Sequence, residues 1–274
     1  MLRAIFGFLN KKEENSSFWG HIDQLRVYLI RSIIAIFGFT VAAFFYKNII
    51  FDKIIMAPSD TNFITYKALC KIGTLIHVDG LCTPSFKLSL INIELAGQFR
   101  YHLLISTIVG IIISFPFIVW QLWLFVKPAL KENEIKKTRG MVAYITGLFF
   151  IGIAFGYYVI VPLTVNFLAT YELSSIIKNQ ITVGSYISTV SVLTLSMGLV
   201  FELPVLVFFL GKIGLLTASF LRKNRKYAIV IIFIAAGFIT PSTDMFSQAL
   251  VAMPMLLLYE VSIFVCKRAQ PKEI

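Results

Sequence analysis

The chain has 274 residues, of which 58% are hydrophobic and 14% are charged. This composition excludes a water-soluble globular domain, because so apolar a chain could not cover its surface with polar groups. The formal net charge of +11 does not indicate nucleic-acid binding, since the Lys and Arg residues gather at the ends of apolar segments rather than on one polar face. We interpret these cations as topology signals and expect no nucleic-acid partner.

Six apolar segments predict six transmembrane helices in a single domain that covers residues 1–274. They are residues 27–46, 103–126, 141–168, 187–210, 227–240 and 246–266. A helix needs about 20 residues to cross a bilayer, so four segments are long enough, the fifth is short and the sixth is interrupted by Pro254. We expect an all-α membrane protein whose last two helices form a tight hairpin.

The loop between the first and second segments, residues 47–101, is too long for a simple turn. We expect it to form a small extracytoplasmic cap. It contains Pro58 and two of the three cysteines, Cys70 and Cys82. An extracytoplasmic compartment permits a disulfide between these two cysteines, although two cysteines alone do not require one.

The short loops set the predicted orientation. Basic clusters follow the second and fourth segments, whereas the third-to-fourth loop has only Lys178 and the fifth-to-sixth loop has no Lys or Arg. Positively charged short loops remain in the cytoplasm. Both termini are therefore expected in the cytoplasm.

Several prolines and two acids fall within or beside these segments. The prolines are Pro58, Pro116, Pro162, Pro204 and Pro254. Proline kinks inside helices shape a concave bundle or serve packing alone. Glu202 and Glu260 are functional candidates because a carboxylate in the membrane is costly without a partner. The alternative is that each is protonated or hydrogen-bonded to a backbone carbonyl freed by the neighbouring proline.

After these elements are assigned, the residue strings resemble those of the TatC family, the core receptor subunits of the Sec-independent twin-arginine protein translocase. The resemblance covers nearly the whole chain. It is carried by HIDQLR (21–26), APSD (57–60), SFPFIVWQLWLFVKPALKENE (114–134), FGYYVIVPLTVNFL (155–168), FELP (201–204), RKYAIV (225–230) and TPSTDMFSQALVAMPMLLLYE (240–260).

This resemblance implies a glove-shaped, concave bundle of six kinked helices in the bacterial cytoplasmic (inner) membrane. It implies binding of twin-arginine signal peptides of folded cargo at the cytoplasmic face. Single-span TatA-type and TatB-type proteins would join it in a multimeric complex, within membrane lipid. Because the proton-motive force drives such transport, we expect no enzyme activity and no cofactor, and the chain lacks the phosphate-binding pattern GxxxxGK[ST].

The resemblance also implies site residues. Glu134 matches a cytoplasmic glutamate that receives the arginine pair, through the paired hydrogen bonds of a guanidinium with a carboxylate. The family's other glutamate is replaced by Gln24, and the only nearby acid is Asp23. Either Gln24 or Asp23 is a candidate contact.

Separately, Phe125, Trp123 and Gln121 lie near the cytoplasmic end of the second segment and are candidates to shape the peptide groove; the alternative is that they belong to an aromatic interface belt. The position of Phe125 before the Lys127–Pro128 turn favours the groove for that residue.

In the membrane, Glu202 matches an acid that engages a polar residue of a TatA-type helix. Asp244 resembles another acidic position of the family, although capping of the last helix explains it equally well.

Two other classes remain as alternatives, an intramembrane enzyme and a small-molecule transporter. The three histidines, His21, His77 and His102, all lie outside the span centres, and no HExxH motif is present. We therefore expect no metal site. A transporter is disfavoured because the two halves differ in loop lengths and show no internal repeat.

Overall fold

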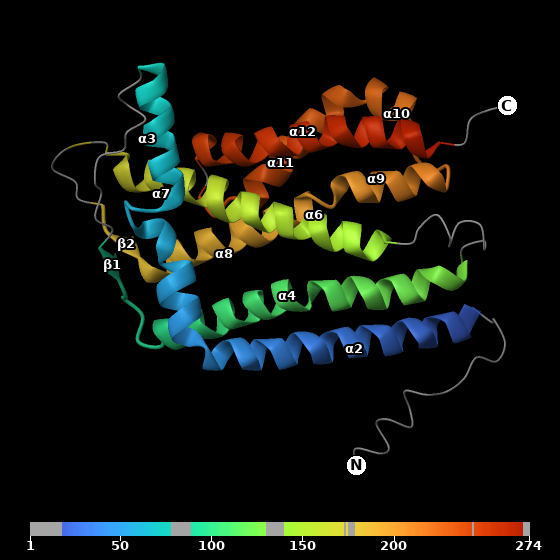
Figure 1. Ribbon diagram of the computed structural model, residues 1–274, viewed down its shortest axis with the longest axis horizontal. Coiled ribbons are helices and arrows are strands. Elements are labelled where there is room, and N and C mark those ends of the chain that lie inside the picture. The colour runs from blue at the N-terminus through green and yellow to red at the C-terminus, as the bar shows by residue number, and fades with distance from the viewer. Residues whose placement is uncertain are drawn as a thin grey trace, which may run out of the picture.

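The computed structural model describes residues 18–77, 89–129, 140–172, 174, 179–242 and 244–270. Helices form nearly all of this part of the chain, and the long ones run side by side along the long axis of the molecule (Figure 1). The elements are α2 (Phe18–Phe45), η1 (Ile49–Ile55), η2 (Ala57–Ser59), α3 (Ile64–Ile76), β1 (Leu90–Ile91), α4 (Gly97–Val126), η4 (Lys127–Ala129), α6 (Met141–Phe155), η5 (Gly156–Ile160), α7 (Val161–Thr170), β2 (Ile181–Thr182), α8 (Val183–Val200), α9 (Leu203–Lys212), α10 (Ala218–Lys223), α11 (Arg225–Ile239) and α12 (Met245–Ala269).

Among the residues that the structure describes, five helical segments are long and apolar enough to cross a membrane. They are Gly20–Phe45, Gly97–Val126, Met141–Thr170, Val183–Lys212 and Met245–Ala269. Helix α11, which corresponds to the short fifth predicted span, has 15 residues. At 1.5 Å per residue it is roughly 22 Å long, less than the hydrocarbon core of a typical bilayer. The membrane class is confirmed, and the crossing of the membrane by α11 stays a prediction.

The third span is interrupted by the π-helical segment η5. Helix α7 follows directly and has Pro162 in its first turn. Proline has no backbone N–H, so Pro162 cannot bond to the carbonyl of Tyr158 one helical turn earlier. The hydroxyl of Thr65 donates a hydrogen bond to that carbonyl instead. The external loop therefore satisfies a backbone group that the proline leaves free.

The fourth span is broken at Phe201 and Glu202, and α9 then begins with Pro204 in its first turn. A proline is tolerated there because the first N–H groups of a helix have no intrahelical partner. Before the break, α8 crosses α6 at glycines. A methyl group on Gly152 would lie 2.6 Å from the carbonyl oxygen of Met197, so the two backbones are in direct contact.

The predicted hairpin of the last two segments is present as α11 and α12. Near the turn, the Gln248 side chain donates to the carbonyl of Phe233 at 2.7 Å. At the other end, Arg225 pairs with Glu260 at 2.7 Å, and the Tyr259 hydroxyl donates to the carbonyl of Leu221 at 2.8 Å. The contacts of Gln248 and Arg225 fix the register of the hairpin, and the contact of Tyr259 ties α12 to α10.

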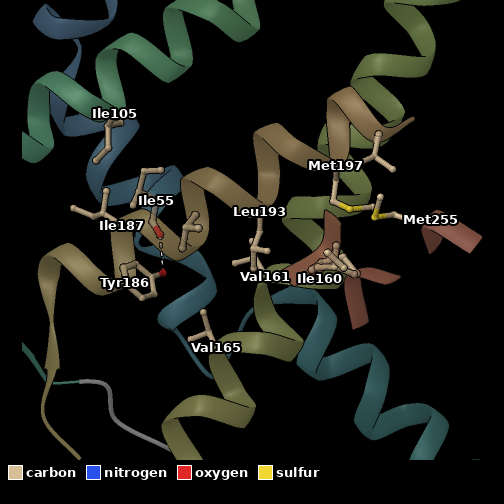
Figure 2. Packing of buried hydrophobic residues seen from close by; sticks show 14 of the residues in the cluster. Ile55, Ile105, Ile160, Val161, Val165, Tyr186, Ile187, Leu193, Met197 and Met255 are labelled. Atoms are coloured by element: carbon tan, nitrogen blue, oxygen red, sulfur yellow. Dashed lines mark hydrogen bonds between the residues drawn. The ribbon is translucent and has the colours of Figure 1, made fainter. Parts of the chain in front are cut away.

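Helix α8 carries much of the buried core. Its residues Ile187, Leu193 and Met197 are fully buried and pack against residues of η5, α7 and α12 (Figure 2). The Tyr186 hydroxyl donates to the carbonyl of Ile55 at 2.7 Å, which ties η1 of the external loop to the same core (Figure 2). The loop is thus packed into the bundle rather than suspended above it.

The all-helix expectation misses one small feature, a parallel pairing of β1 with β2. Leu90 lies opposite Ile181, and Ile91 lies opposite Thr182. Each strand has two residues, which is too short to produce the alternating pattern by which a strand is recognised in a sequence. The pairing joins the external loop to the connection between α7 and α8.

Candidate functional site

Helices α2 and α4 are antiparallel neighbours, and their aromatic side chains meet at both ends. At one end, the rings of His21 and Phe125 stack with centroids 4.4 Å apart. At the other end, Phe44 stacks on His102 at 4.0 Å, and the His102 ring lies 3.1 Å from the Phe44 carbonyl. The start of α2 is therefore held against the end of α4.

This arrangement brings the first turns of α2, which contain the predicted contact residues Asp23 and Gln24, to the end of α4 that carries Phe125. The whole HIDQLR segment is helical, because α2 begins at Phe18, nine residues before the predicted start of the first span at residue 27. Consecutive helical residues point about 100° apart. Asp23 is exposed and Gln24 is partly buried, so Asp23 does not occupy the direction of Gln24.

Gln121 lies one helical turn before Phe125, on the same side of α4. Its side chain is only 6% exposed. Its amide oxygen has no hydrogen-bond partner among the described residues. A buried amide oxygen without a partner is costly, so a donor group that reached Gln121 would be stabilised by it.

Two predicted site residues lie outside the described residues. Glu134 follows the last described residue of the α4 end, Ala129, and Cys82 lies in the external loop. Cys70, on α3, is disulfide-bonded, and Cys266 is a free, buried thiol. The pairing of Cys70 with Cys82 stays a prediction.

Glu202 occupies the break between α8 and α9. The side chain is partly buried, and its Oε1 atom is buried without a hydrogen-bond partner in the described part of the chain. At this break the backbone of Phe201 and Glu202 forms a turn instead of a continuous helix. A polar atom in this state inside an apolar bundle is available to a partner that brings its own polar group.

Glu260 has a partner that the sequence analysis did not identify. Its Oε2 atom lies 2.7 Å from a guanidinium nitrogen of Arg225, and both side chains are about half exposed. The carboxylate is thus neither bonded to a carbonyl freed by Pro254 nor isolated. We infer that Glu260 stabilises the hairpin, and its contact with a partner helix stays a prediction.

The predicted structural prolines occupy different positions. Pro116 and Pro254 lie inside the continuous helices α4 and α12. Pro204 lies in the first turn of α9. Pro58 is buried in η2 of the external loop, where its carbonyl accepts a hydrogen bond from the Tyr66 hydroxyl at 3.1 Å. Pro58 therefore shapes the cap rather than a span.

The described residues contain no group of three or more His, Cys, Asp and Glu side chains that could hold a metal ion. The sequence analysis includes His21 in the HIDQLR motif but does not predict its stacking on Phe125. The spacing of three residues places His21 and Gln24 on one face of a helix, but it does not show that Phe125 lies against that face.

Three comparisons place the chain among known proteins. A family model described as Sec-independent protein translocase protein (TatC) matches residues 20–254. The TatC protein of Blattabacterium sp. subsp. Periplaneta americana is 39% identical over 258 residues, which cover 93% of this chain and 97% of that protein. The TatC protein of Carboxydothermus hydrogenoformans is 37% identical over 253 residues, which cover 92% and 93%.

A solved structure agrees with these relatives. A crystal structure of the twin arginine translocase receptor TatC superposes with a TM-score of 0.73 at 32% sequence identity, covering 91% of this chain and 99% of that chain. The agreement extends over fold and sequence together, and it confirms the resemblance carried by the motifs. The chain belongs to the TatC family of Sec-independent protein translocase proteins.

Proposed function

We propose that this chain is the signal-peptide receptor subunit of a twin-arginine translocase in a bacterial cytoplasmic membrane. The observation that carries the proposal is the match to the twin arginine translocase receptor over 91% of the chain. The six-span, glove-shaped topology with cytoplasmic termini belongs to the same proposal. In it, α11 is a short fifth crossing that thins the bilayer locally.

The proposed peptide site lies where the start of α2 meets the end of α4. The rings of His21 and Phe125 stack with centroids 4.4 Å apart, which brings the helical turn that contains Gln24 to the end of α4. Glu134 follows α4 in the sequence. Glu134 would bind the arginine pair through charge-assisted hydrogen bonds. Gln24 would accept a weaker hydrogen bond from the same pair, because a neutral amide oxygen attracts a guanidinium less than a carboxylate does. Phe125 and Gln121 would line the groove.

The proposed contact with TatA-type and TatB-type helices lies at Glu202. Its buried Oε1 has no partner among the described residues, so a polar side chain from an incoming helix would satisfy it. Such a pair is worth about 1 kcal/mol within a membrane. That modest energy suits a contact that forms during transport and is then released.

The two alternatives have less support. Both an intramembrane enzyme and a small-molecule transporter are disfavoured because the relatives are named as protein translocase proteins.

Export of a folded reporter by cells that lack their own TatC protein tests the proposal. The wild-type chain, supplied with its own partner subunits, is expected to export a reporter with a twin-arginine signal and not one with a twin-lysine signal. Glu134→Ala should lose this export, whereas Glu172→Ala, a matched change of an exposed carboxylate after α7, should keep it. Equal export of both reporters would refute the proposal.

A further inference from the structure

Helix α3 of the external loop presents an apolar stripe that no other described element covers. Ile64, Ile72 and Leu75 are 64%, 51% and 81% exposed. Ala68, between them, is exposed as well. These four positions are separated by three or four residues, so they form one face of the helix.

The opposite face of α3 is fixed to the bundle. Tyr66 is 4% exposed, and its hydroxyl lies 3.1 Å from the carbonyl oxygens of both Pro58 and Pro162. The Thr65 hydroxyl donates to the carbonyl of Tyr158. Gly73, two turns further along, is buried on the same side as Tyr66. The helix therefore cannot rotate to bury its exposed apolar stripe.

The direction and depth of α3 are those of a helix in the membrane plane. Figure 1 shows α3 running across the long helices at one end of the bundle. It is anchored at Tyr158 and Pro162, which belong to the span Met141–Thr170. At 1.5 Å per residue, Tyr158 and Pro162 lie roughly 25 to 30 Å from the start of that span at Met141. That distance corresponds to the far edge of a hydrocarbon core of about 30 Å.

Two cations lie beside the apolar stripe. Lys67 and Lys71 are exposed and one helical turn apart. Their direction differs from that of the stripe by about a quarter turn at 100° per residue. An apolar face flanked by lysines is the pattern of helices that lie at a lipid surface, with apolar groups among acyl chains and cations at phosphate groups.

We propose that α3 is an interfacial helix that binds the extracytoplasmic leaflet. Ile64, Ile72 and Leu75 insert into the acyl region, and Lys67 and Lys71 contact phospholipid phosphates. The lipid contact holds the cap at a fixed depth, and the cap in turn holds the carbonyls around Pro162. This inference depends on the membrane location and not on signal-peptide binding.

Spin-label accessibility in nanodiscs tests the apolar part of the proposal. A nitroxide amino acid is placed at position 75 and, as the matched control, at position 74, an exposed site on the lysine side of α3. We expect the label at 75 to collide more with oxygen, which concentrates among acyl chains, and the label at 74 to collide more with a water-soluble nickel chelate. Equal nickel collisions at both positions would overturn the proposal, and so would a label at 75 shielded from both reagents, which would indicate a protein partner.

Lipid charge tests the role of the lysines. The label at 75 is compared between nanodiscs of phosphatidylcholine alone and nanodiscs that also contain phosphatidylglycerol. Oxygen collisions should rise with the anionic lipid in the wild-type background and stay unchanged in the Lys67→Gln/Lys71→Gln variant. An identical response in both backgrounds would exclude the phosphate contacts. A failure of either test would leave the receptor proposal intact, because the proposed peptide site, at the start of α2 and the end of α4, lies at the other end of the bundle from α3.

Discussion

The imidazole of His21 stacks on the ring of Phe125 with an interplanar angle of 24°. The Tyr28 ring contacts Phe125 edge-on, with centroids 6.4 Å apart. These contacts hold the first turns of α2 against the last turn of α4, so the proposed peptide groove has an aromatic floor that exists before a peptide arrives. A preformed site reduces the ordering cost of binding.

The first prediction concerns this stack. Phe125→Leu keeps an apolar side chain but removes the ring contacts, which are worth about 1 kcal/mol. We expect the affinity for a twin-arginine peptide to fall about fivefold. Titration of a labelled peptide into nanodiscs measures the change. Phe117→Leu, on an exposed part of the same helix, should leave the affinity unchanged, and an equal loss in both variants would contradict a specific role for Phe125.

Gln24 provides a gain-of-function prediction. Gln24→Glu restores the second carboxylate that the family motif contains, and a charged acceptor near the surface adds about 1 kcal/mol. The twin-arginine peptide should therefore bind about fivefold more tightly. Asp23→Asn serves as the control, because Asp23 points in another direction. An unchanged affinity for Gln24→Glu would count against the assignment of Gln24 to the groove.

Much of the fold was predictable because membrane spans have strong sequence signals. The length of the apolar segments located the five long helices, and Pro241 located the hairpin turn. The sequence could not show that Thr65 donates to the Tyr158 carbonyl that Pro162 leaves free, because Thr65 and Tyr158 are 93 positions apart. It also could not show that Glu260 pairs with Arg225, which lies 35 positions away.

The candidate site was predictable only in part. The candidate role of Gln24 came from the resemblance and that of Phe125 from its place before the turn at Lys127, whereas the approach of the start of α2 to the end of α4 depends on the antiparallel packing of the two helices. The contact of His21 with Phe125 follows from that packing and from no local pattern. Glu134, named from its motif, lies outside the described residues.

The crossing of α6 and α8 gives a stability prediction. Gly152→Ala places a methyl group 2.6 Å from the Met197 carbonyl oxygen, whereas the added methyl of Gly147→Ala has nothing within 4 Å. Overpacking of this kind costs about 1 to 3 kcal/mol. Thermal unfolding in detergent should show a lower Tm for Gly152→Ala and an unchanged or slightly higher Tm for Gly147→Ala. Similar melting of the two variants would contradict the close crossing.

Glu202 should separate stability from transport. Its buried Oε1 has no partner in the described part of the chain, so Glu202→Leu should stabilise the isolated protein by about 1 kcal/mol or more. The same change should abolish crosslinking to a TatA-type helix, while Glu202→Gln should retain some of it through its amide. A destabilised Glu202→Leu variant would show that the carboxyl has a structural partner.

Asp244 gives a pH prediction. It caps α12, with its Oδ1 accepting from the Ser247 amide at 2.7 Å. Burial favours the neutral acid, but the hydrogen bonds that the carboxylate accepts prevail and hold the pKa of Asp244 below its ordinary value of 3.8. Because this pKa is lower in the folded state than in the unfolded state, the carboxylate stabilises the protein at pH values above the ordinary pKa. The stabilisation is lost as the pH falls through the folded-state pKa.

The comparison of wild type with Asp244→Asn isolates this effect, because Asn caps a helix but does not titrate. The wild type should have the higher Tm at pH 6, and the difference should shrink as the pH falls below the ordinary pKa and disappear below the folded-state value. Asp244→Ala should lose about 1 kcal/mol at neutral pH. A constant difference between wild type and Asp244→Asn across this range would show that the carboxylate charge is not involved.

Binding of a twin-arginine signal peptide to the purified protein in nanodiscs, compared with its twin-lysine counterpart, tests the receptor assignment most directly. The measurement includes Glu134→Gln and the matched control Glu172→Gln. We predict that the wild type and Glu172→Gln prefer the arginine peptide and that Glu134→Gln loses the preference. Equal affinity of the wild type for both peptides, or an unchanged preference in Glu134→Gln, would contradict the account.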